Sequence, residues 1–193
     1  MTDDERKYLF EELCGEAGWA VHYWRLDQRL FGDRQHVDVM RKTAPIFFGL
    51  HQRLLIDGML LSIQTLLDPA ISSRGDKSAT LEMLLHGLPR GANATVTRSL
   101  RKRLARMRKE CEEIKDWRNR EGAHLDLQTV LIQAPEPKVR LRVVAQVTKD
   151  IIEFLKDFAA EFYPDVTHIV EEPELDGDTL MFLLEQGQAR HTS

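Results

Sequence analysis

The sequence predicts an all-α protein, an up-and-down helical bundle of four to five long helices and one short helix. Three observations predict it. Apolar residues recur at helical spacing over long segments, glycine and proline are sparse and cluster between those segments, and no internal repeat or low-complexity tract is present. The 193 residues suffice for one domain with a substantial core, and a composition of 42% hydrophobic and 30% charged residues is ordinary for a soluble helical protein.

The first half of the chain predicts two long helical regions. One covers residues 4–31 and ends at Gly32 and Asp33. The other covers residues 34–67 and is interrupted near Pro45, because proline lacks the N–H that a helix interior needs.

The segment from 46 to 67 is apolar on every face of its helix. Such a helix is either central in a bundle or shared with a partner. Asp68 and Pro69 end it, and a polar loop follows. Ser78 is the expected N-cap of a short helix that runs through Leu85 and ends before Gly87.

A fourth long helix is predicted from residue 92 to Arg120 or beyond. On a helical wheel its apolar residues form one stripe, comprising Leu100, Leu104, Met107, Cys111 and Ile114. The opposite face carries basic residues, namely Arg98, Arg101, Lys102, Arg106, Arg108 and Lys109. If the helix is continuous, Arg118 falls in the middle of the apolar stripe, where a guanidinium needs an anionic partner or a wet cleft.

The last third of the chain predicts a small hairpin, a fifth helix and a tail. Residues 129–132 and 139–142 are candidates to pair as the hairpin, and residues 143–162 form the helix with a broad apolar face. We therefore divide the chain into a bundle, residues 1–163, and an acidic linker with a short C-terminal helix, residues 164–193. That helix is expected at about 179–186.

Charge is distributed unevenly along a chain whose net charge is −4. Between Arg98 and Lys109 there are seven basic and no acidic residues, and between Pro164 and Asp178 there are six acidic and no basic ones. The basic run predicts contact with RNA, although such a run is often only a solvated face. The candidate RNA-binding residues are Arg101, Lys102, Arg106, Lys109 and Arg120. For the tail we weigh two roles: docking on the basic face, where it would compete with RNA, or covering one end of the bundle.

Composition also bears on cofactors and on the compartment. Cys14 and Cys111 have no metal-ligand spacing, and the seven histidines show neither an HxxxH nor an HExxH pattern. We expect no metal and no cofactor. The charged N-terminus and the lack of an 18-residue apolar run predict a cytoplasmic protein without a membrane segment.

The segment from Asp116 to Asp126 reads Asp-Trp-Arg-Asn-Arg-Glu-Gly-Ala-His-Leu-Asp. An arginine, a polar residue, a short spacer and a histidine form the signature of the HEPN superfamily, and the wording resembles its abortive-infection branch, the AbiU type. The sequence Leu66-Leu67-Asp68-Pro69, followed by a polar loop and Ser78, Leu81, Leu84 and Leu85, resembles the same branch. The resemblance covers about residues 40–160.

The resemblance implies a metal-independent endoribonuclease that acts as a homodimer in phage defence or with a protein antitoxin. It implies that Arg118 neutralises charge on the phosphate, that Asn119 positions the phosphate or the imidazole, and that His124 transfers protons. The other interpretations are a structural role for Arg118, an inactive module that binds RNA, nucleotide or a protein partner, and an unrelated helical scaffold.

Overall fold

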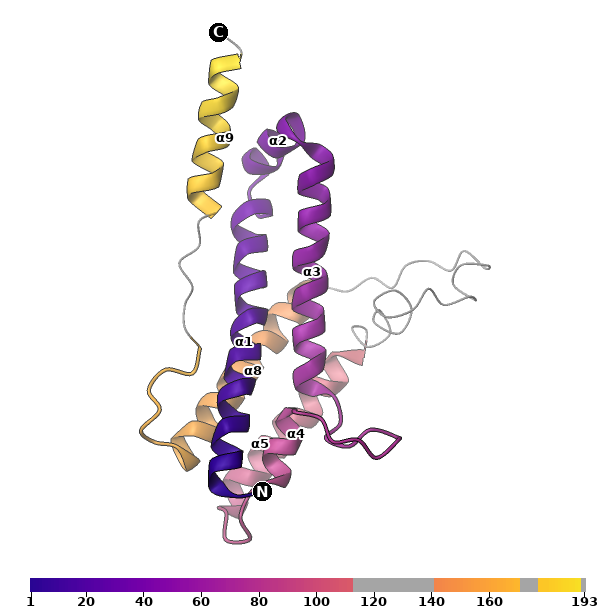
Figure 1. The fold of residues 1–193 in the computed structure, drawn as a ribbon, viewed down its shortest axis with the longest axis vertical. Coiled ribbons are helices and arrows are strands. Elements are labelled where there is room, and N and C mark those ends of the chain that lie inside the picture. The colour runs from indigo at the N-terminus through magenta and orange to yellow at the C-terminus, as the bar shows by residue number, and fades with distance from the viewer. Residues whose placement is uncertain (113–140, 171–176, 192–193) are drawn as a thin grey trace, which may run out of the picture.

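The structure is a computed structural model that describes residues 1–112, 141–170 and 177–191 (Figure 1). Over these residues the chain forms seven helices, and the predicted all-α bundle is confirmed. Within the described ranges, the only strand-like pairing is a single antiparallel bridge between Ile71 and Lys77.

The first three helices are α1 (Asp3–Phe31), α2 (Arg34–Thr43) and α3 (Pro45–Leu67). Figure 1 shows α1 and α3 running antiparallel side by side, with α2 joining them at one end. The expected breaks are confirmed: Gly32 caps the end of α1, and Pro45 is the first residue of α3. The Asp33 side chain caps α2 by accepting a bond of 2.7 Å from the Gln35 backbone N–H.

The next helices are α4 (Leu81–His86) and α5 (Ala94–Glu110). The expected cap of α4 was wrong by two residues, since Thr80 and not Ser78 accepts the bond from the Met83 backbone N–H, at 3.2 Å. Both candidates are hydroxyl residues, and the sequence pattern did not distinguish them. Gly87 follows α4 as predicted.

Helix α5 ends earlier than predicted. It stops at Glu110, and Cys111 occupies its C-cap with non-helical dihedral angles, so the helix is not continuous through Cys111, although Glu112 is helical again. The buried stripe is confirmed for Leu100, Leu104, Met107 and Cys111, all nearly inaccessible to solvent. Residues 113–120, including Ile114 and Arg118, lie outside the described residues. The wheel position of Arg118 therefore has no support, because it assumed continuity through Cys111.

Helix α8 (Leu141–Phe162) begins two residues before the predicted start. Leu141 and Arg142 are helical, so the predicted hairpin strand at 139–142 was wrong for these two residues. The rest of that hairpin lies outside the described residues. The apolar face of α8 packs on α5 and α1 and contributes much of the core. Phe10 of α1 stacks on Phe158 of α8, with ring centroids 5.7 Å apart.

Helix α9 (Gly177–His191) is longer than the helix predicted at about 179–186 and packs against α1 and α2. Its Met181 completes a small cluster with Leu30, Met40 and Phe48, and Asp178 pairs with Arg29 of α1. Figure 1 places α9 at the end of the molecule away from α5. Within one chain α9 is thus not docked on the basic face of α5, and it covers one end of the bundle, which is the second of the two roles weighed for the tail.

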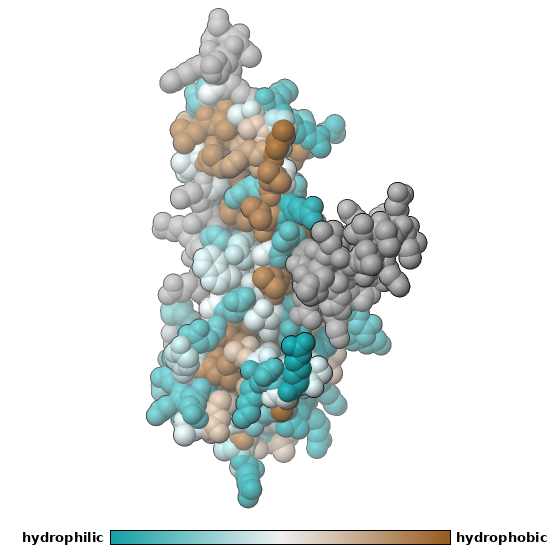
Figure 2. Space-filling view, turned by 45° about the vertical axis from the view of Figure 1, so that its right-hand side comes forward, coloured by the Kyte–Doolittle hydropathy of each residue, from teal (hydrophilic) through white to brown (hydrophobic). Residues whose placement is uncertain are grey.

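Helix α3 is apolar all round, as predicted, but it is buried on one side only. Met59, Leu60, Ile63 and Leu66 are fully buried, whereas a row of large apolar residues faces outward. This row, the α3 stripe, comprises Ile46, Phe47, Leu50, Leu54 and Leu61, each 58–79% exposed. Figure 2 shows apolar side chains gathered on the upper part of the molecule. Among the described helices, α3 is the one long and apolar enough to cross a membrane, a property that core helices of soluble proteins share.

One guanidinium joins three helices of the lower half. Arg108 of α5 donates to the backbone carbonyls of Leu67 and Asp68, at 2.7 and 2.8 Å. It also donates to both carboxylate oxygens of Glu82 in α4, each at 3.1 Å. Glu82 in turn accepts from the Ala70 backbone N–H at 2.8 Å. The end of α3, the following loop and α4 are thus fixed to α5 by charge-assisted hydrogen bonds.

We expect Arg108→Met to lower the free energy of unfolding by about 2–3 kcal/mol, since it removes several charge-assisted bonds and leaves Glu82 without its cation. Urea denaturation measures this. The neighbouring exposed Lys109→Met should change stability by less than about 0.5 kcal/mol. Equal effects of the two variants would show that Arg108 does not fix the end of α3.

Candidate nucleic-acid interface

The cations of α5 divide into those already paired and those left free for a ligand. Arg103 pairs with Asp157 at 2.8 Å and Arg106 with Asp150 at 2.9 Å, and both pairs fasten α5 to α8. Arg108 holds Glu82. The remaining four cations are exposed and have no ion pair within the part of the chain that the structure describes; they are Arg98, Arg101, Lys102 and Lys109.

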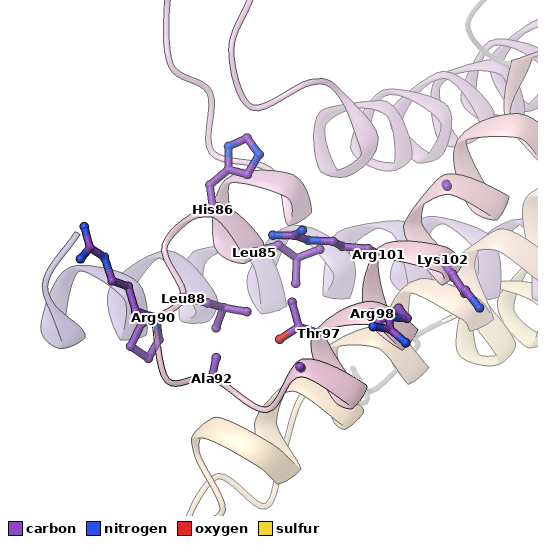
Figure 3. A pocket seen from close by; sticks show the side chains of 12 residues that line it. Leu85, His86, Leu88, Arg90, Ala92, Thr97, Arg98, Arg101 and Lys102 are labelled. Atoms are coloured by element: carbon purple, nitrogen blue, oxygen red, sulfur yellow. The ribbon is translucent and has the colours of Figure 1, made fainter.

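A cavity of about 710 Å³ lies between α5 and the loop that precedes it (Figure 3). Its floor includes Leu85, Leu88 and Thr97, and the Thr97 hydroxyl is buried without a hydrogen-bond partner. Four cations line it, Arg90 from the loop and Arg98, Arg101 and Lys102 from α5. Among the described residues, no Asp or Glu lines this cavity, so its potential is positive and favours an anion.

A second cavity, of about 810 Å³, continues along α5 between the end of α3 and α4. The two cavities share Leu85, His86, Arg101 and Ala105, so they form one groove. We call it the α5 groove. Its second half is lined by the exposed Lys109, by the Arg108–Glu82 pair and by the buried residues Gln64, Leu67, Leu104 and Cys111.

The charge state of the second cavity follows from its contacts. The hydrogen bonds from Arg108, followed by the Ala70 N–H, hold the pKa of the Glu82 carboxyl below its usual value although partial burial opposes this. Glu82 is therefore ionised at neutral pH and neutralises Arg108. This half is also lined by the cationic Arg101 and Lys109 and by the acidic Asp68 and Glu112, so it has no net positive charge, and the excess of cations lies in the first cavity.

The structure places some of the predicted site residues and not others. Arg101, Lys102 and Lys109 line the α5 groove. The Arg106 guanidinium pairs with the largely buried carboxylate of Asp150. It is therefore less available to bind an RNA phosphate than an unpaired cation is. Arg118, Asn119, Arg120 and His124 lie outside the described residues.

Several groove residues were not among the predicted RNA-binding ones, including Arg98, Arg90, His86 and Gln64. His86 and Arg90 lie on either side of the turn between α4 and α5. Nothing in their sequence distance from the basic run indicated that they line the same cavity as the α5 cations. Gln64 stands in the apolar segment that becomes α3. A polar amide in so apolar a helix was the one signal available.

The described residues form neither a metal site nor a reactive thiol. Within the described ranges no group of three or more His, Cys, Asp or Glu residues is placed to hold a metal ion. Burial raises the pKa of both cysteine thiols to about 12, so Cys14 and Cys111 are protonated and poor nucleophiles.

A helical bundle whose basic helix forms a cationic groove ahead of an arginine–histidine motif fits the HEPN class of domains. The AbiU2 profile of that class matches residues 3–179, well beyond the 40–160 region of the noted resemblance. The chain belongs to the AbiU2 family of HEPN domains. Among curated proteins and among solved structures, no similar chain was found.

We expect Gln64→Met to raise the free energy of unfolding by about 1–2 kcal/mol. Gln64 is 5% exposed, and neither its amide oxygen nor its amide nitrogen has a hydrogen-bond partner among the described residues. Methionine keeps the length of the side chain and removes the unpaired groups. Thermal or urea unfolding measures the effect, and Gln35→Met on the exposed face of α2 is the matched control. A loss of stability at position 64 would mean that the amide is paired in solution.

Proposed function

We propose that the protein is a metal-independent endoribonuclease that acts as a homodimer, in the cytoplasm, in phage defence or together with a protein antitoxin. The observation that carries the proposal is the α5 groove, whose first cavity is lined by four cations, along the helix that precedes the arginine–histidine motif of an AbiU2-type HEPN domain. Glu112 lines the groove and stands six residues before Arg118 in the sequence.

In this proposal the groove binds the RNA strand and the arginine–histidine motif cleaves it. The unpaired cations of the groove bind successive phosphates without reading sequence. The 2′-hydroxyl of the RNA attacks the adjacent phosphorus, and the 5′-oxygen of the next nucleotide leaves. His124 transfers the proton to or from these oxygens, Arg118 neutralises the charge that develops on the phosphate, and Asn119 positions either group.

A second candidate function is an inactive module that binds RNA, nucleotide or a protein partner. The α5 groove favours it as well, since every residue that lines it lies outside the motif. Both functions predict that the protein binds RNA, so only an assay of RNA cleavage distinguishes them.

For the nuclease, we expect the purified protein to cut single-stranded RNA in EDTA and to leave 2′,3′-cyclic phosphate or 3′-phosphate ends. Arg118→Ala and His124→Ala should each lower the rate by at least about 100-fold, as removal of a charge-stabilising or proton-transferring group does. A 2′-deoxy substitution at the cleaved nucleotide should block the reaction. Product ends are identified by mass spectrometry.

The control variant is Arg41→Ala, which removes an exposed arginine of α2 and should leave the rate unchanged. Cleavage that requires added divalent metal, or that survives both motif variants, would contradict the mechanism. Binding without cleavage would favour the inactive module.

For the groove, we expect Arg101→Ala combined with Lys102→Ala to weaken RNA binding and to lower the slope of log K against log salt by about 1–1.5, because about 0.7 counterion is released per phosphate contact with single strands. Fluorescence anisotropy from 50 to 300 mM salt measures the slope. The matched control, Arg41→Ala with Lys42→Ala, removes the same charge from exposed positions on α2. Equal slopes in the two double variants would exclude the groove as the RNA-binding surface.

The α3 stripe supports the homodimer. Its five residues fall within about 100° of the helix circumference, so they share one face of α3. Asp57 lies within this face, and Arg53, 3.7 Å away, lies at its edge. In an antiparallel two-fold contact the opposite charges of each chain would meet in reverse order, which makes the surface complementary to itself.

We expect a dimer at micromolar concentration that buries more than about 1,200 Å² in total. Leu50→Glu combined with Leu54→Glu should give a folded monomer, because two carboxylates would enter the apolar contact. Ile71→Glu, an equally exposed apolar position in the loop after α3, should leave the dimer intact. Light scattering measures the mass. A monomeric wild type, or one that binds lipid vesicles through this face, would contradict the dimer.

A further inference from the structure

Positive charge in the α5 groove is concentrated at one end. Among the described residues no Asp or Glu lines the first cavity, and its cations are Arg90, Arg98, Arg101 and Lys102. The second cavity is lined by three cations, one of which is the shared Arg101, and by the carboxylates of Asp68, Glu82 and Glu112. The charges of the second cavity therefore cancel, and the excess of cations lies near the turn between α4 and α5.

The cations of the first cavity are available to a ligand. All four residues are exposed, and none has an ion pair within the part of the chain that the structure describes. Figure 3 shows Arg90 on one side of the cavity and Arg98 and Lys102 on the other, with Leu88 between them. Cations from the loop and from α5 thus flank one opening. The first turn of α5 contains no acidic residue, so it does not weaken this positive potential.

This distribution matches an anion whose charge is also concentrated. An internal phosphodiester of RNA carries a single negative charge on two free oxygens. A terminal phosphomonoester carries about −1.5 to −2 at neutral pH and has three free oxygens. Three oxygens can accept hydrogen bonds from cations on both sides of the cavity, and arginine binds phosphate oxygens in pairs. A strand with internal phosphates alone would carry equal charge along the groove, although the second cavity offers it no net positive charge.

We propose that the first cavity anchors a terminal phosphate of the RNA, at its 5′ or its 3′ end, and that the adjoining nucleotides lie along the rest of the α5 groove. The anchor rests on the proposed function for its RNA ligand, but it requires no cleavage. It lets the protein select RNA by the chemistry of the strand end, which contacts to internal phosphates cannot do.

The test compares short RNAs of one sequence that carry 2′-O-methyl groups to prevent cleavage and an internal fluorophore. They end in hydroxyls, in a 5′-phosphate or in a 3′-phosphate, and fluorescence anisotropy measures their affinity for the full chain. A hydroxyl-ended RNA that is longer by a nucleotide carries the added phosphate as an internal diester. At least one terminal phosphate should tighten binding about tenfold over both hydroxyl-ended RNAs, as charge-assisted hydrogen bonds allow.

The variants separate the two cavities. Arg90→Ala combined with Arg98→Ala should reduce the preference to less than about twofold, because these residues line only the first cavity and supply its charge-assisted bonds. Lys109→Ala, in the second cavity, should keep the preference. So should the matched double variant Arg41→Ala with Lys42→Ala on α2.

Equal affinity of all the RNAs, or a preference that survives the Arg90 and Arg98 double variant in a folded protein, would overturn the anchor. The outcomes are distinct from those of the nuclease test. RNA cleavage without an end preference would leave the nuclease and exclude the anchor. An end preference without cleavage would support the anchor and favour the inactive module.

Discussion

The lower half of this molecule depends on the contact between Arg108 and Glu82. Helix α3 ends at Leu67 and leaves carbonyl groups without helical partners, and Arg108 satisfies two carbonyls at this point. Glu82 completes the arrangement by accepting from Ala70, so one ion pair sets the position of the loop and of α4 against α5. The α5 groove is the space between these same elements. The shape of the groove therefore depends on this salt bridge. Both partners are only partly exposed, and a pair in such a place is stronger than one on an open surface.

The two ends of the bundle differ in chemistry because the helices use their surfaces differently. At the lower end, cations that are not needed for packing remain on α5 and face a hollow lined by leucines. At the upper end, α9 covers part of the apolar surface of α1 and α2, but the α3 stripe stays uncovered. The cationic cavity and the uncovered apolar face thus lie at separate places, so the proposed RNA contact and the proposed dimer contact would not compete for one surface.

Helix boundaries that depend on local backbone chemistry were predictable from the sequence. Gly32, Pro45 and Gly87 each end or begin a helix where expected, because glycine and proline act through their own backbone. The end of α5 was not predictable, since the apolar spacing continues past Cys111 and a helical wheel contains no information on where the chain turns.

Features that depend on neighbours distant in sequence could not be predicted from the sequence either. Arg108 sits at the edge of the basic face on a wheel, and only the folded chain shows that it points to α3 and α4. The cations of the basic run were predicted correctly as a group, but their division into paired and free depended on Asp150, Asp157 and Glu82.

The rows of α5 side chains differ in what a substitution would disturb. Arg103, Arg106 and Arg108 each hold another helix, so their replacement affects folding before it affects any ligand. Arg98, Arg101, Lys102 and Lys109 hold no described ion-pair partner, so their replacement costs the bundle little stability. The outward charges of this helix can therefore be exchanged one by one in a protein that still folds, whereas the inward charges cannot.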